Sequence, residues 1–347
     1  MTDAAPFLLV EFYYPMVDDG RGGDMVGDAC LLDVVQPVAA ALSQLDGVTG
    51  HEFMRYSLDG YHLRIKFHGQ PEALQRLADE QVRPALLAFA DRHAQWLAQD
   101  MALGDFGQRL VARLGKQGDP LREGGDFALR MARDAQDVFE SAQVRGHYLA
   151  LSRHMCDLVL ASIACGLDQR ERRALARLLL MQLLAATGMQ AAGLHYLATF
   201  AARQWQGYFD IEPAQIARCQ ATAAAAAAPF SAFLASAGDT PGIARALPER
   251  VRAAYIQHMS PMLALMPLLV EIGEGGAATN HAALRVLSLV HLAHNRLGLN
   301  ILQEIIFAEL ACHHYAAQLD PAATRSNREW VDRNLSTYLA NTDHIAV

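Results

Sequence analysis

The stretch "YHLRIKFHG", residues 61–69, alternates apolar side chains with polar side chains that are cationic or can become so. Successive side chains of a β-strand point to opposite faces, so the polar set shares one face and the apolar set shares the other. The polar set is His62, Arg64, Lys66 and His68. Arginine presents a planar fork that matches a carboxylate, so this row could bind an acidic group of a substrate. The alternative is the solvated face of an edge hairpin, where charge discourages pairing with other strands.

A second strand is predicted immediately before this row. The residues "EFMRYS" at 52–57 have strand character, and the Asp-Gly pair at 59–60 is typical of a tight hairpin turn. Tyr56 and His62 flank that turn, and Arg55 would join the cationic row in one of the two registers. Because a shift of one residue exchanges the two faces, the sequence leaves the position of Arg55 open.

Several polar side chains project from a late helix that is otherwise apolar. In "SLVHLAHNRLGLNILQEIIFAEL", residues 288–310, they fall on neighbouring rows of the helix. They are His291, His294, Asn295 and Arg296. Buried polar groups need partners or a task, and a neutral imidazole near pH 7 can accept or return a proton. A hydrogen-bonded structural pair of His and Arg is the alternative interpretation.

Two further residues of this segment bear on a site. Gly298 lies inside the predicted helix, where glycine costs about 1 kcal/mol relative to alanine, so another group is expected to pack closely against it. Glu304 lies eight residues after Arg296 on a similar face. It is expected to be the counter-charge of Arg296 or a second polar wall of a pocket.

The elements that would position these groups change character along the chain. Residues 7–14, "FLLVEFYY", predict a buried strand. Helices are predicted over 31–45, with Pro37 as a kink or a late start, and over 71–97. Together with the hairpin, these elements form a small α+β region over residues 1–115.

The remainder, residues 116–347, is predicted to be mainly α-helical. Arg122 precedes a Gly-Gly turn, and the helix after it is expected to be capped near Asp126. Breaks are expected at "PFSAF" and at the Gly-containing stretches 238–242 and 273–280. The expected helices cover about 127–142, 147–166, 169–187, 189–223, 245–272 and 281–318, and a terminal helix follows Pro321. The predicted fold class is α+β, with a small N-terminal sheet and its helices joined to a mostly α-helical bundle in one compact catalytic domain.

Composition limits the classes of partner and cofactor. The chain has 347 residues, a net charge of −8 and a pI near 5.9, which argues against a general nucleic-acid binder. Five scattered cysteines without a C-x-x-C pair indicate reduced thiols and a cytoplasmic protein. No export signal or membrane-length apolar segment is evident. Neither a phosphate-binding loop nor a dinucleotide-binding glycine motif is present, so no cofactor is expected.

Two clusters of metal-ligand residue types occur, at residues 154–156 and 312–314. Neighbouring helical positions diverge by about 100°, so the side chains of each cluster do not converge on one point. No metal site is therefore expected.

Three segments, in this order, resemble a known family. They are "FMRYSLDGYHLRIKFHG", "REGGDFALRMARDAQDVFES" and "HLAHNRLGLNILQE". They are similar to the Arg-Tyr, His-Leu-Arg-x-Arg, Arg-Tyr-Gly-Gly and His-x-x-x-Asn-Arg-Leu-Gly motifs of the C-terminal elimination domain of class I lantibiotic dehydratases, also called the thiopeptide-type bacteriocin biosynthesis domain. The resemblance spans about residues 7–318 and identifies the chain as a stand-alone member.

The resemblance implies a lyase that modifies a ribosomally made precursor peptide, with its leader and core. One implied reaction eliminates glutamate from glutamylated Ser or Thr and leaves a dehydroamino acid. The alternative is a pyridine synthase, which joins two dehydroalanines in a formal 4+2 cycloaddition and releases the leader peptide. A third alternative is a non-catalytic leader-peptide-binding partner of a split dehydratase, with the first strand as the docking edge.

The resemblance also implies roles for single residues. His291 stands at the position of the catalytic histidine, and Arg64 and Lys66 stand at the positions of paired arginines that bind glutamate. Lys66 departs from the usual second arginine and Glu123 from a usual tyrosine, and both changes weaken glutamate handling and leave room for ring formation. The implied substrate-binding residues are Arg55, Tyr56, His62, Arg122, His294, Asn295 and Arg296. This interpretation requires the basic row and His291 to line one cavity.

The implied partners follow from the same resemblance. They are the precursor peptide and a separate tRNA-dependent glutamyl-transferring dehydratase subunit. No direct contact with nucleic acid or with a membrane is expected, and a homodimer is compatible with the sequence.

Overall fold

The computed structural model describes residues 6–17, 24–57, 60–113, 121–133, 141–270 and 280–341. The chain divides into two compact units, residues 1–170 and residues 171–347. The sheet belongs to the first unit, and the described residues of the second unit form helices and their connections. The expected α+β class is confirmed.

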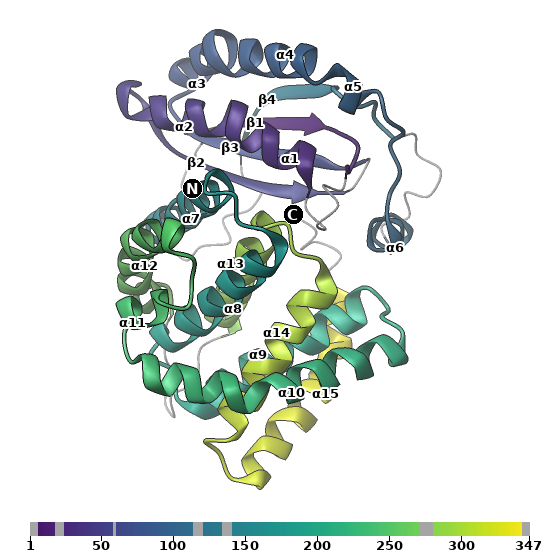
Figure 1. Cartoon of the computed structure of the whole chain (residues 1–347), viewed down its shortest axis with the longest axis vertical. Coiled ribbons are helices and arrows are strands. Elements are labelled where there is room, and N and C mark those ends of the chain that lie inside the picture. Colours follow the sequence, from purple (N-terminus) through teal and green to yellow (C-terminus); the bar gives the residue numbers. More distant parts are fainter. Residues whose placement is uncertain are drawn as a thin grey trace. The chain divides into compact units, whose positions relative to one another are not determined.

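A four-stranded sheet organises the first unit (Figure 1). Its strands are β1 (Pro6–Tyr13), β2 (Val48–Tyr56), β3 (His62–Gly69) and β4 (Phe127–Arg133). The strand order is β2-β3-β1-β4, and every neighbouring pair is antiparallel. The predicted hairpin of β2 and β3 is confirmed, although Asp59 of its predicted turn lies outside the described residues.

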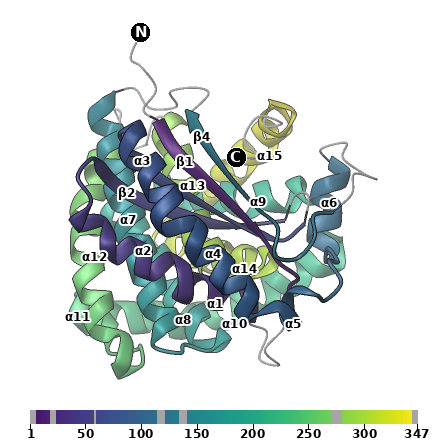
Figure 2. The ribbon, with the colours of Figure 1, turned by 90° about the horizontal axis from the view of Figure 1, so that it is seen from above.

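Helices cover one face of this sheet (Figures 1 and 2). They are α1 (Met25–Cys30), α2 (Gln36–Ala41), α3 (Pro71–Leu77) and α4 (Arg83–Arg92). Phe12 of β1 and Phe89 of α4 meet edge to face in the core, with ring centroids 5.5 Å apart. The shorter elements are η1 (Leu31–Val35), η2 (Leu42–Gln44), η3 (Ala78–Val82), α5 (Ala94–Leu97) and α6 (Asp105–Arg113). A longer helix, α7 (Ala142–Ala164), packs against β2.

The helical segment around Pro37 begins earlier than predicted, at Met25, and it continues past the proline. The π-helical turn η1 ends at Val35, two residues before Pro37, and proline cannot donate the usual backbone hydrogen bond. The helix predicted over 71–97 is confirmed, with an interruption at His93 between α4 and α5, where the backbone is not helical.

The helix predicted over 127–142 is wrong for its described part, because Phe127–Arg133 is the strand β4. Alanine and arginine favour helices in isolation, but pairing along the open side of β1 outweighs that preference. The sheet therefore extends beyond residue 115, where the α+β region was expected to end.

The first strand does not lie at an edge of the sheet. β1 pairs with β3 on one side and with β4 on the other, so its backbone groups are already used within the sheet. The expectation that β1 offers a docking edge for a leader peptide is therefore wrong. The edges of the described sheet are β2 and β4.

The second unit is built from helices (Figure 1). They are α8 (Gln169–Ala186), which begins at the end of the first unit, and α9 (Ala191–Tyr208), α10 (Pro213–Ala237), α11 (Thr240–Ala244), α12 (Glu249–Leu269), α13 (Asn280–Arg296), α14 (Ile301–Ala316) and α15 (Pro321–Asn341). α14 packs against α9 and α10, and α15 packs against α9. None of the helices in the described residues combines the length and the hydropathy needed to cross a membrane.

The segment predicted as one helix over 281–318 forms two helices. Gly298 has a φ of 77°, a left-handed conformation that glycine adopts easily, so it ends α13 instead of lying inside a helix. Asn300 and Gln303 then form a capping box, in which each side chain accepts a hydrogen bond from the other residue's backbone N–H. We call the link from Leu297 to Asn300 the corner.

Two other predicted helix boundaries differ. The helix predicted over 189–223 is divided between α9 and α10, with Asp210 at a φ of 46° in the connection. The break predicted at "PFSAF" is wrong, because α10 continues past Pro229 to Ala237. Its long alanine run has the highest intrinsic helix propensity, which offsets the hydrogen bond that proline cannot donate.

Candidate functional site

Seven polar side chains share one face of the sheet, which we call the polar face. The strand register places Arg64 of β3 opposite Glu11 of β1, and Lys66 opposite Glu52 of β2. The polar face consists of Glu11, Glu52, His62, Arg64, Lys66, His68 and Arg130. The intervening side chains of β3 are buried and apolar, so the alternation predicted from the sequence is confirmed.

Glu11 is a shared carboxylate at the centre of the polar face. Its side chain is 8% exposed, and its Oε1 accepts a hydrogen bond from Arg64 Nε at 3.0 Å. Arg130 of β4 lies 3.3 Å from Oε2, and His62 Nε2 lies 4.0 Å from Oε1. Two guanidinium groups from different strands therefore converge on one carboxylate, which is the geometry that binds an acidic group strongly.

Glu52 forms a second, separate cluster. Its Oε1 lies 3.9 Å from Lys66 Nζ and 3.4 Å from His68 Nε2. Ser152 of α7 donates a hydrogen bond to Oε2 at 3.1 Å. Lys66 is therefore engaged with an internal carboxylate, whereas Arg130 keeps a side chain that is 58% exposed.

Aromatic rings flank the cations near Glu11. The guanidinium carbon of Arg64 lies 3.9 Å from the ring centroid of Tyr56, and that of Arg122 lies 5.7 Å from the ring of Tyr13. The ring of His62 lies between these tyrosines, with centroids 4.6 Å from Tyr13 and 5.2 Å from Tyr56. Arg64, Arg122, Tyr56 and His62, all implied site residues, thus gather at one end of the polar face.

Arg55 lies on the opposite face of the sheet and does not join the cationic row. The register places it beside Leu63, and its guanidinium contacts Asp24 Oδ2 at 2.6 Å and Asp28 Oδ1 at 2.5 Å. Tyr14 also donates a hydrogen bond to Asp24. Arg55 therefore links β2 to α1 among the helices, and the implied substrate-binding role has no support from its position.

In the second unit, His291 of α13 contacts Glu304 of α14 across the corner. The distance from His291 Nδ1 to Glu304 Oε2 is 3.0 Å, the Glu304 side chain is 5% exposed and that of His291 is 33% exposed. Trp205 of α9 lies against the imidazole, with centroids 4.5 Å apart. If Nδ1–H donates to the carboxylate, the neutral ring keeps Nε2 as a base.

Glu304 tunes the imidazole electrostatically. Burial alone would lower the pKa of His291, but the charge of Glu304 and its hydrogen bond outweigh burial and raise that pKa above its ordinary value. Burial would raise the pKa of Glu304, but the charge of His291, its hydrogen bond and the nearby imidazole of His294 lower it. His291 and Glu304 therefore favour an ion pair that can release one proton.

The neighbouring polar residues of α13 have different surroundings. His294 Nδ1 lies 3.6 Å from the same Glu304 oxygen, and its ring meets Phe307 edge to face. Arg296 is 1% exposed, and Asn295 is half-buried. Glu304 thus contacts two imidazoles, which is not the first of its two expected roles, that of counter-charge to Arg296.

Sequence reasoning missed several residues of these clusters, among them Glu11, Arg130 and Trp205. Glu11 lay within an apolar strand, and a lone charge among buried residues was the signal that could have identified it. Arg130 was not predicted as a member of the polar face because its segment was predicted as a helix. Trp205 carried no signal, since an aromatic side chain in an amphipathic helix usually belongs to the core.

Comparisons with known proteins add independent findings. The family model described as "Lantibiotic biosynthesis dehydratase C-term" matches residues 22–315. A search of curated protein sequences found no match.

Solved structures that match with a TM-score above 0.5 share the fold. The pyridine synthase TbtD from thiomuracin biosynthesis is 18% identical, with a TM-score of 0.57, and the match covers 90% of this chain and 98% of TbtD. TsrL is 14% identical, with a TM-score of 0.51 and coverages of 93% and 97%. The tRNA-dependent lantibiotic dehydratase MibB from Microbispora sp. 107891 is 18% identical, with a TM-score of 0.47, and the match covers 93% of this chain but 29% of MibB.

Proposed function

The chain belongs to the family of the C-terminal region of lantibiotic biosynthesis dehydratases, and we propose that it is a lyase that eliminates glutamate from glutamylated Ser or Thr of a ribosomally made peptide. The base removes the α-proton of the esterified residue, and those electrons form the Cα–Cβ double bond. The Cβ–O bond breaks, and glutamate leaves through the carboxylate of the former ester. The product is a dehydroamino acid.

The observation that carries this proposal is the convergence of Arg64 and Arg130 on Glu11. It supports a polar face whose cations can hold a second carboxylate, that of the glutamyl group, through charge-assisted hydrogen bonds. The exposed side chain of Arg130 and the flanking Arg122 supply donors that Glu11 does not saturate. Lys66, which contacts Glu52, adds positive charge but lacks the planar pair of donors with which an arginine binds a carboxylate.

His291 is the proposed acid and base. Glu304 orients its ring through Nδ1, which leaves Nε2 for proton transfer to and from the substrate. The partly exposed imidazole can be reached by a substrate, whereas the buried carboxylate of Glu304 cannot compete for the same task. We assign Glu304 as a positioning residue.

Ring formation between two dehydroalanines is the second candidate. The observation that favours it is the cluster of Tyr56, His62 and Tyr13, in which a phenol lies beside an imidazole and could supply protons to an amide-derived oxyanion. The contact of Lys66 with Glu52 also supports a lower affinity for the glutamyl group than two arginines would give.

The test uses purified protein and two peptides. A glutamylated peptide that loses glutamic acid, seen as a mass decrease, supports elimination. A peptide that already contains dehydroalanines and azoles, and that is converted to a ring with release of its leader, supports ring formation instead. If the protein converts neither peptide but binds the leader tightly, it is instead a non-catalytic, leader-binding partner of a dehydratase. In the elimination reaction a separate tRNA-dependent subunit supplies the glutamyl ester.

A further inference from the structure

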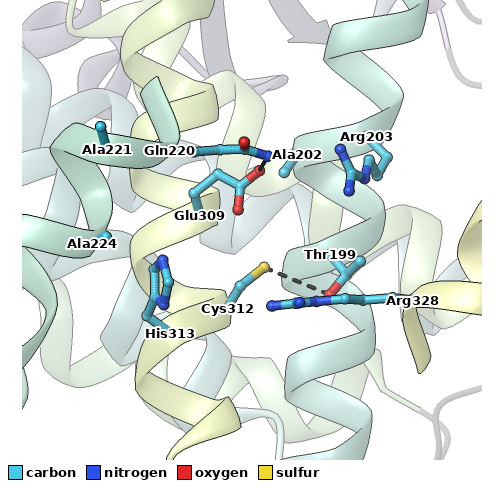
Figure 3. Close-up of a pocket in the computed structure, with 10 residues that line it drawn as sticks. All are labelled: Thr199, Ala202, Arg203, Gln220, Ala221, Ala224, Glu309, Cys312, His313 and Arg328. Carbon is cyan, nitrogen blue, oxygen red and sulfur yellow. Dashed lines mark hydrogen bonds between the residues drawn. The ribbon is translucent and has the colours of Figure 1, made fainter. Parts of the chain in front are cut away.

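A hollow of about 380 Å³ lies within the second unit, among α9, α10, α14 and α15 (Figure 3). It is distinct from the His291 and Glu304 pair, and no residue that lines it has a role in the proposed elimination. Its size falls in the range of pockets that bind small ligands or single side chains with their flanking groups.

Small side chains create the space. Ala202 of α9 and Ala221 and Ala224 of α10 line the hollow (Figure 3). α10 packs closely against α14, and its alanine run places methyl groups where larger side chains would fill the gap. Ala221 and Ala224 are exposed, so the hollow is open to solvent along α10.

Two guanidinium groups from different helices line the hollow. Arg203 of α9 donates a hydrogen bond to Gln206 at 3.0 Å and lies 3.6 Å from Asp332. Arg328 extends from α15 to a position beside Thr199 and Cys312 (Figure 3). Within the part of the chain that the structure describes, Arg328 makes neither a hydrogen bond nor an ion pair, so its donors are available to a ligand.

A hydrogen-bonding wall faces these cations. Glu309 Oε1 accepts a hydrogen bond from Gln220 Nε2 at 3.2 Å (Figure 3). It also accepts one from Gln206 Nε2 at 3.3 Å. These bonds fix the carboxylate and leave its Oε2 as an acceptor for an N–H group, while the Gln220 carbonyl oxygen can accept a second one. One wall therefore suits amide groups, and the other suits a carboxylate.

The floor of the hollow is chemically inert. Cys312 is buried, and Thr199 lies 3.6 Å from its Sγ. Burial, followed by the nearby charge of Glu309, raises the pKa of Cys312 to about 12, so the sulfur stays a neutral thiol near pH 7. The site is therefore suited to binding and not to nucleophilic chemistry.

We propose that this hollow is a second peptide-binding subsite, which takes an acidic side chain of the peptide between Arg328 and Arg203 and the flanking amides at Glu309 and Gln220. The proposal rests on the proposed function only in taking a peptide as the ligand. Arg203 is shared with Asp332, which lies 3.6 Å away. Arg328, which has no ion-pair partner among the described residues, therefore supplies most of the attraction for an anion and most of the discrimination between an acid and its amide.

The experiment compares two probes by isothermal titration calorimetry at low salt: acetyl-Ala-Glu-Ala-amide and acetyl-Ala-Gln-Ala-amide. We expect the acidic probe to bind about tenfold more tightly, and Arg328→Ala to remove that difference. Arg325→Ala is the matched control, because Arg325 is an exposed arginine on the same helix that does not line the hollow. It should bind the acidic probe as the wild type does.

The polar face could also attract the acidic probe, so Arg64→Ala is titrated in parallel. Binding that survives in Arg64→Ala and is lost in Arg328→Ala supports the subsite. Binding that is lost in Arg64→Ala and unchanged in Arg328→Ala overturns it, and so do equal affinities of the two probes. His291→Ala separates the two proposals, since it should abolish elimination and leave probe binding unchanged.

Discussion

The Nδ1 atom of His291 lies 3.0 Å from Oε2 of Glu304, across the corner that joins α13 to α14. A carboxylate in this position selects the orientation of the imidazole and stabilises its charged form. The pair therefore links a reactive ring to a buried anion within one short segment of the chain.

Replacement of Glu304 should shift the pH dependence of turnover. The raised pKa of His291 means that the neutral base forms only as the pH rises through a value above about 6.5. Glu304→Gln removes the anion, so the acid limb of kcat/KM should move to lower pH while kcat falls about a hundredfold. A pH–rate profile checks both effects, and an unchanged acid limb would contradict the assignment.

The same pair should contribute to stability over a defined pH range. The raised pKa of His291 gives stability that is complete below its unfolded value of about 6.5 and is lost as the pH rises through the folded value. The lowered pKa of Glu304 gives stability that is complete above about 4.3 and is lost as the pH falls. The melting temperature difference between wild type and His291→Asn should therefore be largest between about pH 4.3 and 6.5.

Removal of Arg130 should weaken the binding of a glutamylated peptide. We expect Arg130→Ala to raise KM about tenfold with a smaller change in kcat, because a charge-assisted hydrogen bond to the substrate carboxylate is lost. Arg133→Ala is the control, since Arg133 lies on the same strand with Pro6 opposite it, outside the polar face. Equal effects of the two substitutions on KM would remove Arg130 from the site.

Arg55 should matter for stability and not for turnover. Arg55→Ala leaves Asp24 and Asp28 without their guanidinium partner, and removing one member of a buried ion pair costs roughly 3–5 kcal/mol. Denaturant unfolding measures this loss. Folded Arg55→Ala protein, assayed well below its melting temperature, should retain wild-type kcat/KM, and a selective loss of activity would restore the binding role that the sequence implied.

His195 should make the second unit sensitive to acid. It is fully buried, Asn327 Nδ2 donates to its Nδ1 at 3.1 Å, and burial with the charge of Arg328 lowers its pKa to about 4. The unfolded chain then binds a proton first, so stability falls as the pH drops from about 6.5 to 4, by about 3 kcal/mol below both values. His195→Gln should flatten the dependence of the unfolding free energy on pH over this range.

The sequence predicted the parts of the candidate site whose signals are local. The alternation of β3 defines a face without knowledge of the rest of the fold, and the polar residues of α13 stand out against an apolar background. The face occupied by Arg55 depended on the pairing register with β3, which local patterns do not determine.

The remaining differences arise from tertiary contacts. β4 has the composition of a helix, and only an available edge of β1 makes it a strand. Glu11 gains its importance from Arg64 and Arg130, which lie far from it in sequence. The glycine that separates α13 from α14 is visible in the sequence. Its φ is not, and without φ a glycine that ends a helix cannot be distinguished from a glycine inside one.

The corner at Gly298 also determines which changes in chain length the protein can accept. The polar face depends on strands drawn from separate parts of the chain, and the loops between those strands can vary while the strands stay paired. The proton-transfer pair depends on the few residues from Leu297 to Asn300. One residue added or removed there would turn α14 by about 100° and carry Glu304 away from the imidazole. Within the family, this short link is where insertions and deletions should be absent from active enzymes.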